Sequence, residues 1–222
     1  MSVPPDPQPG PLPAAMQIAL GYAGPATRPL FAGLFALDTH CAHLLRRSTE
    51  PMLAQMRLTW WREALAHPAA ERARGSPLLA ALENWTGEDQ ALIRLVDGWE
   101  HLVGASPLPA RDMERFAALR ADAFASVARL LGLHTSEPLL RQATYRWALA
   151  ELVQGLSHPA ERACALELAR HADMAVVSLP RALRPLAVLD ALARRALAKG
   201  GAPLLAGRTS ALVALRAGLL GR

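Results

Sequence analysis

Apolar residues recur at the spacing of an α-helix along most of this 222-residue chain, and this pattern constrains the fold more than any other feature. Leu30, Leu34, Leu37, Cys41 and Leu44 form one such stripe. No stretch shows the alternation of apolar and polar residues, bounded by turns, that is typical of a strand. The sequence therefore predicts an all-α bundle of roughly eight to ten helices joined by short loops.

The chain divides into a short tail and one helical domain. The first thirteen residues, MSVPPDPQPGPLP, are rich in proline and lack the basic and apolar regions of a secretory signal. We predict a disordered tail over 1–13 and a single all-helical domain over 14–222. No apolar run reaches the roughly 18 residues of a membrane-spanning helix, so we expect a soluble protein or one peripheral to a membrane.

Cysteine usage and charge bear on location and partners. Cys41 and Cys164 are far apart and form no CxxC motif, which is typical of free thiols in a reducing cytoplasm. The net charge is +5, and the chain from Arg181 onward carries eight basic residues against Asp190 alone. Such a face is typical of a surface that meets anionic lipid, a phosphate-bearing ligand or an acidic protein, and also of an ordinary solvated helix. No recognition motif accompanies the charge, so we expect no nucleic acid partner.

The least generic stretch is TEPMLAQMRLTWWREAL, residues 49–65. Pro51 suits the first turn of a helix that begins near Thr49. The helical phase predicts that Arg57 lies on an apolar face with Trp60 and Trp61. Because a buried guanidinium needs a partner, Arg57 is predicted either to pair with a neighbouring helix or to bind an anionic ligand.

The helix before this stretch offers a carboxylate for Arg57. Asp38 borders its apolar stripe, where a carboxylate needs a cationic partner, so we predict an Asp38–Arg57 ion pair. His40 and His43 on the same helix lack a third ligand on their face, because the helical phase points Asp38 away from them. The sequence therefore predicts no metal site here.

Two regions of the chain resemble the squalene/phytoene synthase family, the all-α isoprenoid synthases that join two prenyl diphosphates. The first is LFALDTHCAHLLR followed by EPMLAQMRLTWWREAL, and the second is RWALAELVQGL, residues 146–156. The resemblance is greatest over residues 14–66, weaker to Leu156, and beyond that is only a matter of helix pattern. QMRLTWWREAL is most similar to a non-catalytic branch that includes an assembly factor of respiratory complex I. The resemblance implies a helical bundle of the isoprenoid synthase type.

The acidic motifs of active family members are missing from this chain. Those members hold magnesium ions with Asp residues in DxxxD-like arrays on two helices. The corresponding positions of the first array hold Ala42, His43 and Arg46, and those of the second hold Gln154 and Gly155, which leaves Glu151 as the only carboxylate there. None of the nineteen Asp and Glu residues has another carboxylate at i+4. The only internal i, i+3 pair, Asp97 with Glu100, is expected on a solvated helix face.

These observations predict a non-catalytic binding or assembly factor without a cofactor. The expected partners are a prenyl lipid or prenyl diphosphate, or a membrane or respiratory-complex protein, with the chain cytoplasmic or peripheral on the inner membrane face. The alternative is a prenyltransferase that condenses two prenyl diphosphates at an atypical magnesium site. No catalytic residue is assigned, and the candidate pocket or structural pair consists of Asp38, Arg57, Trp60 and Glu151.

Overall fold

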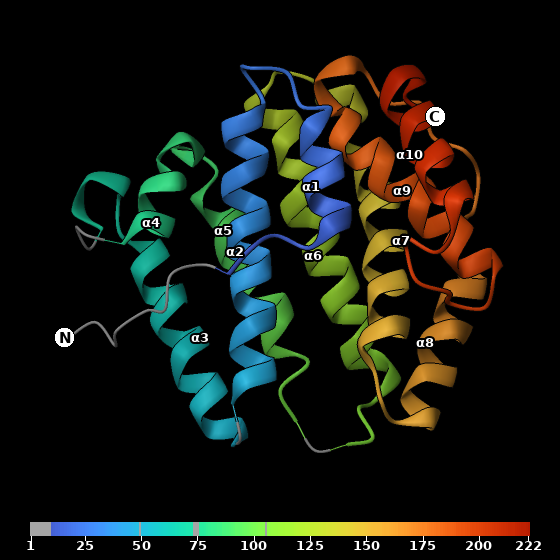
Figure 1. Ribbon diagram of the computed structural model, residues 1–222. Coiled ribbons are helices and arrows are strands. Elements are labelled where there is room, and N and C mark those ends of the chain that lie inside the picture. The colour runs from blue at the N-terminus through green and yellow to red at the C-terminus, as the bar shows by residue number, and fades with distance from the viewer. Residues whose placement is uncertain (1–9, 49, 73–75, 105) are drawn as a thin grey trace.

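The protein is described by a computed structural model over residues 10–48, 50–72, 76–104 and 106–222. Within these ranges ten α-helices and four short 3-10 helices form the fold, with no strand (Figure 1). The all-α prediction is therefore confirmed. The predicted disorder of the tail, for residues 1–9, and the predicted helix start at Thr49 lie outside the described residues.

The elements follow one another with short connections. In chain order the α-helices are α1 Ala14–Gly21, α2 Arg28–Arg47, α3 Pro51–Ala66, α4 Pro77–Ala81, α5 Asp89–Glu100, α6 Ala110–Leu130, α7 Glu137–Gly155, α8 Pro159–His171, α9 Arg184–Ala198 and α10 Arg208–Leu220. The 3-10 helices are η1 Ala69–Glu71, η2 Glu83–Trp85, η3 His134–Ser136 and η4 Arg181–Leu183. Six of the α-helices have proline in their first turn, where its missing N–H is not needed, namely α2, α3, α4, α7, α8 and α9.

The long helices α2, α6 and α7 position the interior of the bundle. Helix α6 packs against α5 and α7, α7 also packs against α8 and α9, and α10 covers α9. In Figure 1, α3 and α4 lie at one edge of the bundle, and α8, α9 and α10 lie at the other. No helix in the described part of the chain is long and apolar enough to cross a membrane.

Aromatic rings join the three central helices. Phe35 of α2, Phe124 of α6 and Trp147 of α7 are fully buried. Their ring centroids lie 5.7 Å apart for Phe35 and Phe124, 5.2 Å for Phe124 and Trp147, and 6.0 Å for Phe35 and Trp147. Burial of such large rings, each in tilted or edge-on contact, fixes the packing of α2 on α6 and α7.

Helix α3 presents a different face to the bundle from the one predicted. Its buried residues are Ala54, Leu58, Trp61 and Leu65, which form a stripe at i, i+4, i+7 and i+11. This stripe is rotated by roughly 90° from the predicted face, as helical geometry measures it. Arg57 is consequently exposed and not buried as expected.

Candidate functional site

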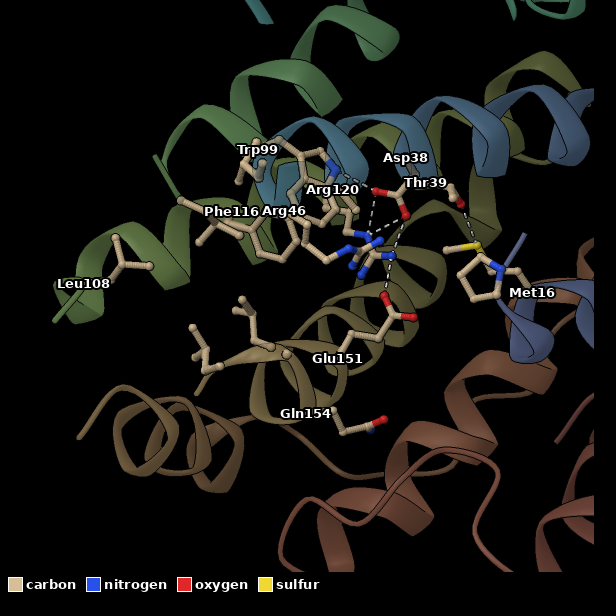
Figure 2. Close-up of a pocket in the computed structure, with 17 residues that line it drawn as sticks. Met16, Asp38, Thr39, Arg46, Trp99, Leu108, Phe116, Arg120, Glu151 and Gln154 are labelled. Atoms are coloured by element: carbon tan, nitrogen blue, oxygen red, sulfur yellow. Dashed lines mark hydrogen bonds and ion pairs between the residues drawn. The ribbon is translucent and has the colours of Figure 1, made fainter. Parts of the chain in front are cut away.

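A cavity of about 450 Å³ lies among α1, α2, α5, α6 and α7. Figure 2 shows the side chains that line it. Most are apolar, namely Pro13, Met16, Ala42, Leu45, Leu102, Leu108, Phe116, Leu152 and Leu156. The polar residues in the lining are Asp38, Thr39, Arg46, Trp99, Arg120, Glu151 and Gln154. A volume of this size and a mainly apolar lining with a few grouped polar atoms are typical of small-molecule sites.

Arg120 of α6 is the centre of the polar part of the cavity wall. Its Nε donates to both carboxylate oxygens of Asp38 at 3.1 Å, and its Nη2 donates to Asp38 Oδ2 and, at 2.6 Å, to Glu151 Oε2. Trp99 Nε1 donates to Asp38 Oδ1 at 2.8 Å. The guanidinium carbon also lies 3.8 Å from the ring centroid of Trp147. One arginine thus links carboxylates of α2 and α7 and stacks on a buried aromatic ring.

Burial sets the electrostatics of this cluster. The side chains of Arg120 and Asp38 are each only 1% exposed, whereas Glu151 keeps 26% of its side-chain surface. Burial acts to lower the pKa of Arg120, but the charges and hydrogen bonds of Asp38 and Glu151 outweigh it, so that the pKa is raised. Burial raises the pKa of Glu151, with the charge of Arg120 acting against this and that of Asp38 adding to it. The cluster carries two carboxylates against one guanidinium.

The predicted Asp38–Arg57 ion pair is wrong. The cation that reaches Asp38 belongs to α6 and not to the adjacent α3, and Arg57 lies on the exposed side of α3. Trp60 is half-buried, contacts Trp61 with ring centroids 5.1 Å apart, and is absent from the cavity lining. Of the four candidate residues, the structure therefore brings together Asp38 and Glu151 and leaves Arg57 and Trp60 outside the site.

Arg120 was missed, although the sequence carries a signal for it. Phe116, Arg120 and Phe124 follow one another at i, i+4 and i+8 on the buried face of α6. Arg57 was singled out as an arginine on an apolar helix face beside large aromatic side chains. The same criterion applied to residues 110–130 selects Arg120, because helical phase places it on the stripe of Phe116 and Phe124.

A second buried arginine holds α7 to α9. Arg146 Nε donates to Asp190 Oδ1 at 2.6 Å, and its Nη1 donates to the backbone carbonyl of Asp173 at 2.6 Å. Asp190 also accepts from Arg194 Nε at 3.1 Å. This cluster lies outside the lining of that cavity, and its ion pair joins α7 to α9. Arg146 and Asp173 instead line a second cavity of about 460 Å³.

Other residues considered for chemistry are also accounted for by packing. Asp97 and Glu100 are partly buried and both accept from Arg62, so they join α5 to α3 and are less solvated than expected. His40 is buried, with its ring centroid 4.8 Å from that of Trp61. Within the described ranges, no group of three or more His, Cys, Asp or Glu side chains is placed to hold a metal ion.

The cavity has room and lining for an apolar molecule. Both carboxylates that line the cavity in the described structure are engaged by Arg120, and Arg46 lies exposed where the lining meets solvent. An apolar chain can be enclosed by the leucines and Phe116, with its polar end near these groups. Comparison of the chain with protein-family models, with curated proteins and with solved structures gave no match.

Proposed function

We propose that this protein is a non-catalytic member of the squalene/phytoene synthase family that binds a prenyl-type lipid in the central cavity. The positions that correspond to the family's two acidic arrays support this proposal. Except for His43, all of them line the same cavity, to which α2 contributes Ala42 and Arg46 and α7 contributes Glu151, Gln154 and Gly155. Two stretches more than a hundred residues apart in sequence therefore contribute to the same cavity.

The non-catalytic part of the proposal rests on the hydrogen bonds that Arg120 donates to Asp38 and Glu151. Magnesium–diphosphate chemistry uses carboxylates that are free to coordinate the ion. Here Asp38 and Glu151 both accept hydrogen bonds from the same buried guanidinium, so an incoming cation would have to displace Arg120. Such a displacement would leave a positive charge in the interior, which is costly.

A turnover assay tests the proposal directly. Purified protein incubated with farnesyl diphosphate or geranylgeranyl diphosphate and magnesium should release diphosphate no faster than a protein-free sample, with an active synthase as the positive control. Release at enzyme-like rates would overturn the proposal in favour of a prenyltransferase with an unusual metal site. In the same preparation, farnesol should bind with a dissociation constant that calorimetry can measure.

A cavity-filling variant ties that binding to the site. Ala42→Leu adds three carbons to the cavity wall and should weaken farnesol binding by about tenfold, as loss of well-packed apolar contact predicts. The matched control is Ala66→Leu, at an exposed position on α3 away from the lining. Equal binding by both variants and the unsubstituted protein would place the ligand elsewhere.

The resemblance also supports a role in assembly at the inner face of a membrane. We expect the tagged protein, isolated from its own cells in mild detergent, to carry a membrane or respiratory-complex protein that a tag-only control lacks. This expectation uses no feature of the cavity and is therefore tested separately. Repeated isolation of the chain alone would contradict it.

A further inference from the structure

Helix α10 has an unusual division between its inner and outer faces. Its buried residues are all small, namely Ser210, Ala214, Ala217 and Gly218. Its large apolar side chains point outward, with Leu212 66% exposed, Leu215 48% and Leu219 65%. These three leucines, at i, i+3 and i+7, form one stripe along the helix, and the exposed Leu220 lies beside it. A helix at the surface of a bundle normally has the opposite arrangement.

The same outer face carries positive charge without a compensating carboxylate. Helical phase places Arg208 in line with the leucine stripe and Arg216 beside it, and both arginines are exposed. From residue 174 to the C-terminus, the only acidic side chain is Asp190, which is buried and bound by Arg146 and Arg194. Within this part of the chain, no exposed acidic side chain therefore offsets the arginines of the stripe.

The stripe cannot turn inward, because α10 is fixed on the bundle at several points. At Gly218 a Cβ atom would come within 2.2 Å of the Tyr22 ring, so this close approach to the α1 end requires glycine. Leu179 N donates to the carbonyl of Gly221 at 3.0 Å, and Arg195 Nη2 donates to Thr209 Oγ1 at 2.9 Å. Figure 1 shows α10 at the outer edge of the bundle, over α9.

We propose that the outer face of α10 is a docking surface for an anionic lipid bilayer. A helix of 13 residues with leucines on one face and arginines beside them can lie in the plane of a bilayer surface, with the leucines in the acyl boundary and the arginines at lipid phosphates. A second copy of the chain is a poorer occupant, since a symmetric contact between two such faces would offer Arg208 and Arg216 no carboxylate from the same face of the other copy. None of these residues lines the cavity, so the inference is independent of the cavity ligand.

Sedimentation with vesicles tests the inference. The full chain should sediment with vesicles of phosphatidylcholine and phosphatidylglycerol in a 3:1 ratio, and stay in the supernatant with phosphatidylcholine alone. Raising the salt concentration to about 0.5 M should release most of it, because charges at a surface are screened at that ionic strength. Equal sedimentation with both kinds of vesicle, or with neither, would overturn the inference.

Paired variants identify the surface. Leu212→Ser with Leu219→Ser, and separately Arg208→Gln with Arg216→Gln, should each weaken partitioning into the anionic vesicles by about tenfold or more. The matched control is Leu53→Ser with Arg57→Gln, which removes an exposed leucine and arginine from α3 and should leave partitioning unchanged. Circular dichroism checks that every variant keeps its helices.

Two results would assign the face differently. If the α3 variant lost binding while the α10 variants kept it, the docking surface would be α3 and the inference would be wrong. If light scattering without lipid gave a dimer that Leu212→Ser with Leu219→Ser converted to a monomer, the stripe would belong to an interface between copies. The inference stands only if the chain binds anionic vesicles through α10.

Discussion

Replacing Arg120 with methionine should lower the free energy of unfolding by about 3–5 kcal/mol at neutral pH. The substitution keeps much of the side-chain volume but leaves the charges of Asp38 and Glu151 without their partner in the interior. Urea denaturation followed by circular dichroism measures the loss. The loss should shrink as the pH falls, because burial raises the pKa of Glu151 and protonation of that carboxyl group removes one of the unpaired charges.

Two further variants test whether the loss of stability comes from the unpaired buried carboxylates or from replacing any arginine of α6. Arg111→Met, at a position 83% exposed on the same helix, should change the free energy of unfolding by less than about 0.5 kcal/mol. Combining Arg120→Met with Asp38→Asn and Glu151→Gln should recover part of the lost stability, because no buried charge then remains unpaired. A single Arg120→Met variant with the urea midpoint of the unsubstituted protein would show that the cluster contributes nothing to stability.

Acidification should destabilise the protein through His40. Burial lowers the pKa of His40 from 6.5 to about 4, and the charges of His43 and Arg57 add to this effect. Between these two values the unfolded chain binds the proton and the folded chain does not, so acid favours unfolding. The contribution is complete above pH 6.5, is lost as the pH falls to about 4, and amounts to about 3 kcal/mol at most.

Comparison with His40→Gln isolates this contribution. The variant has no titrating group at the position, whereas all carboxylates titrate in both proteins and cancel in the difference. The free energy of unfolding of the unsubstituted protein should therefore fall more steeply than that of the variant between pH 7 and pH 4. His134→Gln, at an exposed position, should keep the steeper dependence. Parallel curves for the unsubstituted protein and His40→Gln would contradict the assignment.

The helices were predictable because their signals are local. Proline in the first turn and apolar residues at helical spacing depend on neighbours within a few positions, and the stripe from Leu30 to Leu44 lies within α2 as predicted. The isoprenoid synthase type of the bundle stays a prediction.

The site was predictable only in part, because the partner of a buried charge is decided by packing. Helical phase correctly placed Asp38 at a position that needs a cation, and motif comparison selected Glu151. Neither signal states which helix packs against the Asp38 side of α2. The candidate nearer in sequence, Arg57, lies on the side of α3 that faces solvent. The predicted apolar face of α3 was assigned partly from the large ring of Trp60. The face that packs against the bundle instead contains Ala54 and Leu58.

The Arg120 cluster also makes the packing of the N-terminal helices depend on α6 and α7. Asp38 precedes Arg120 by 82 residues, and Glu151 follows Arg120 by 31. An N-terminal piece that ends before α6 contains the carboxylate of α2 but not its cation, and it also lacks the rings of Phe124 and Trp147 that cover Phe35. We therefore expect the first helices to be unstable as a separate piece, and the chain to unfold in one cooperative transition.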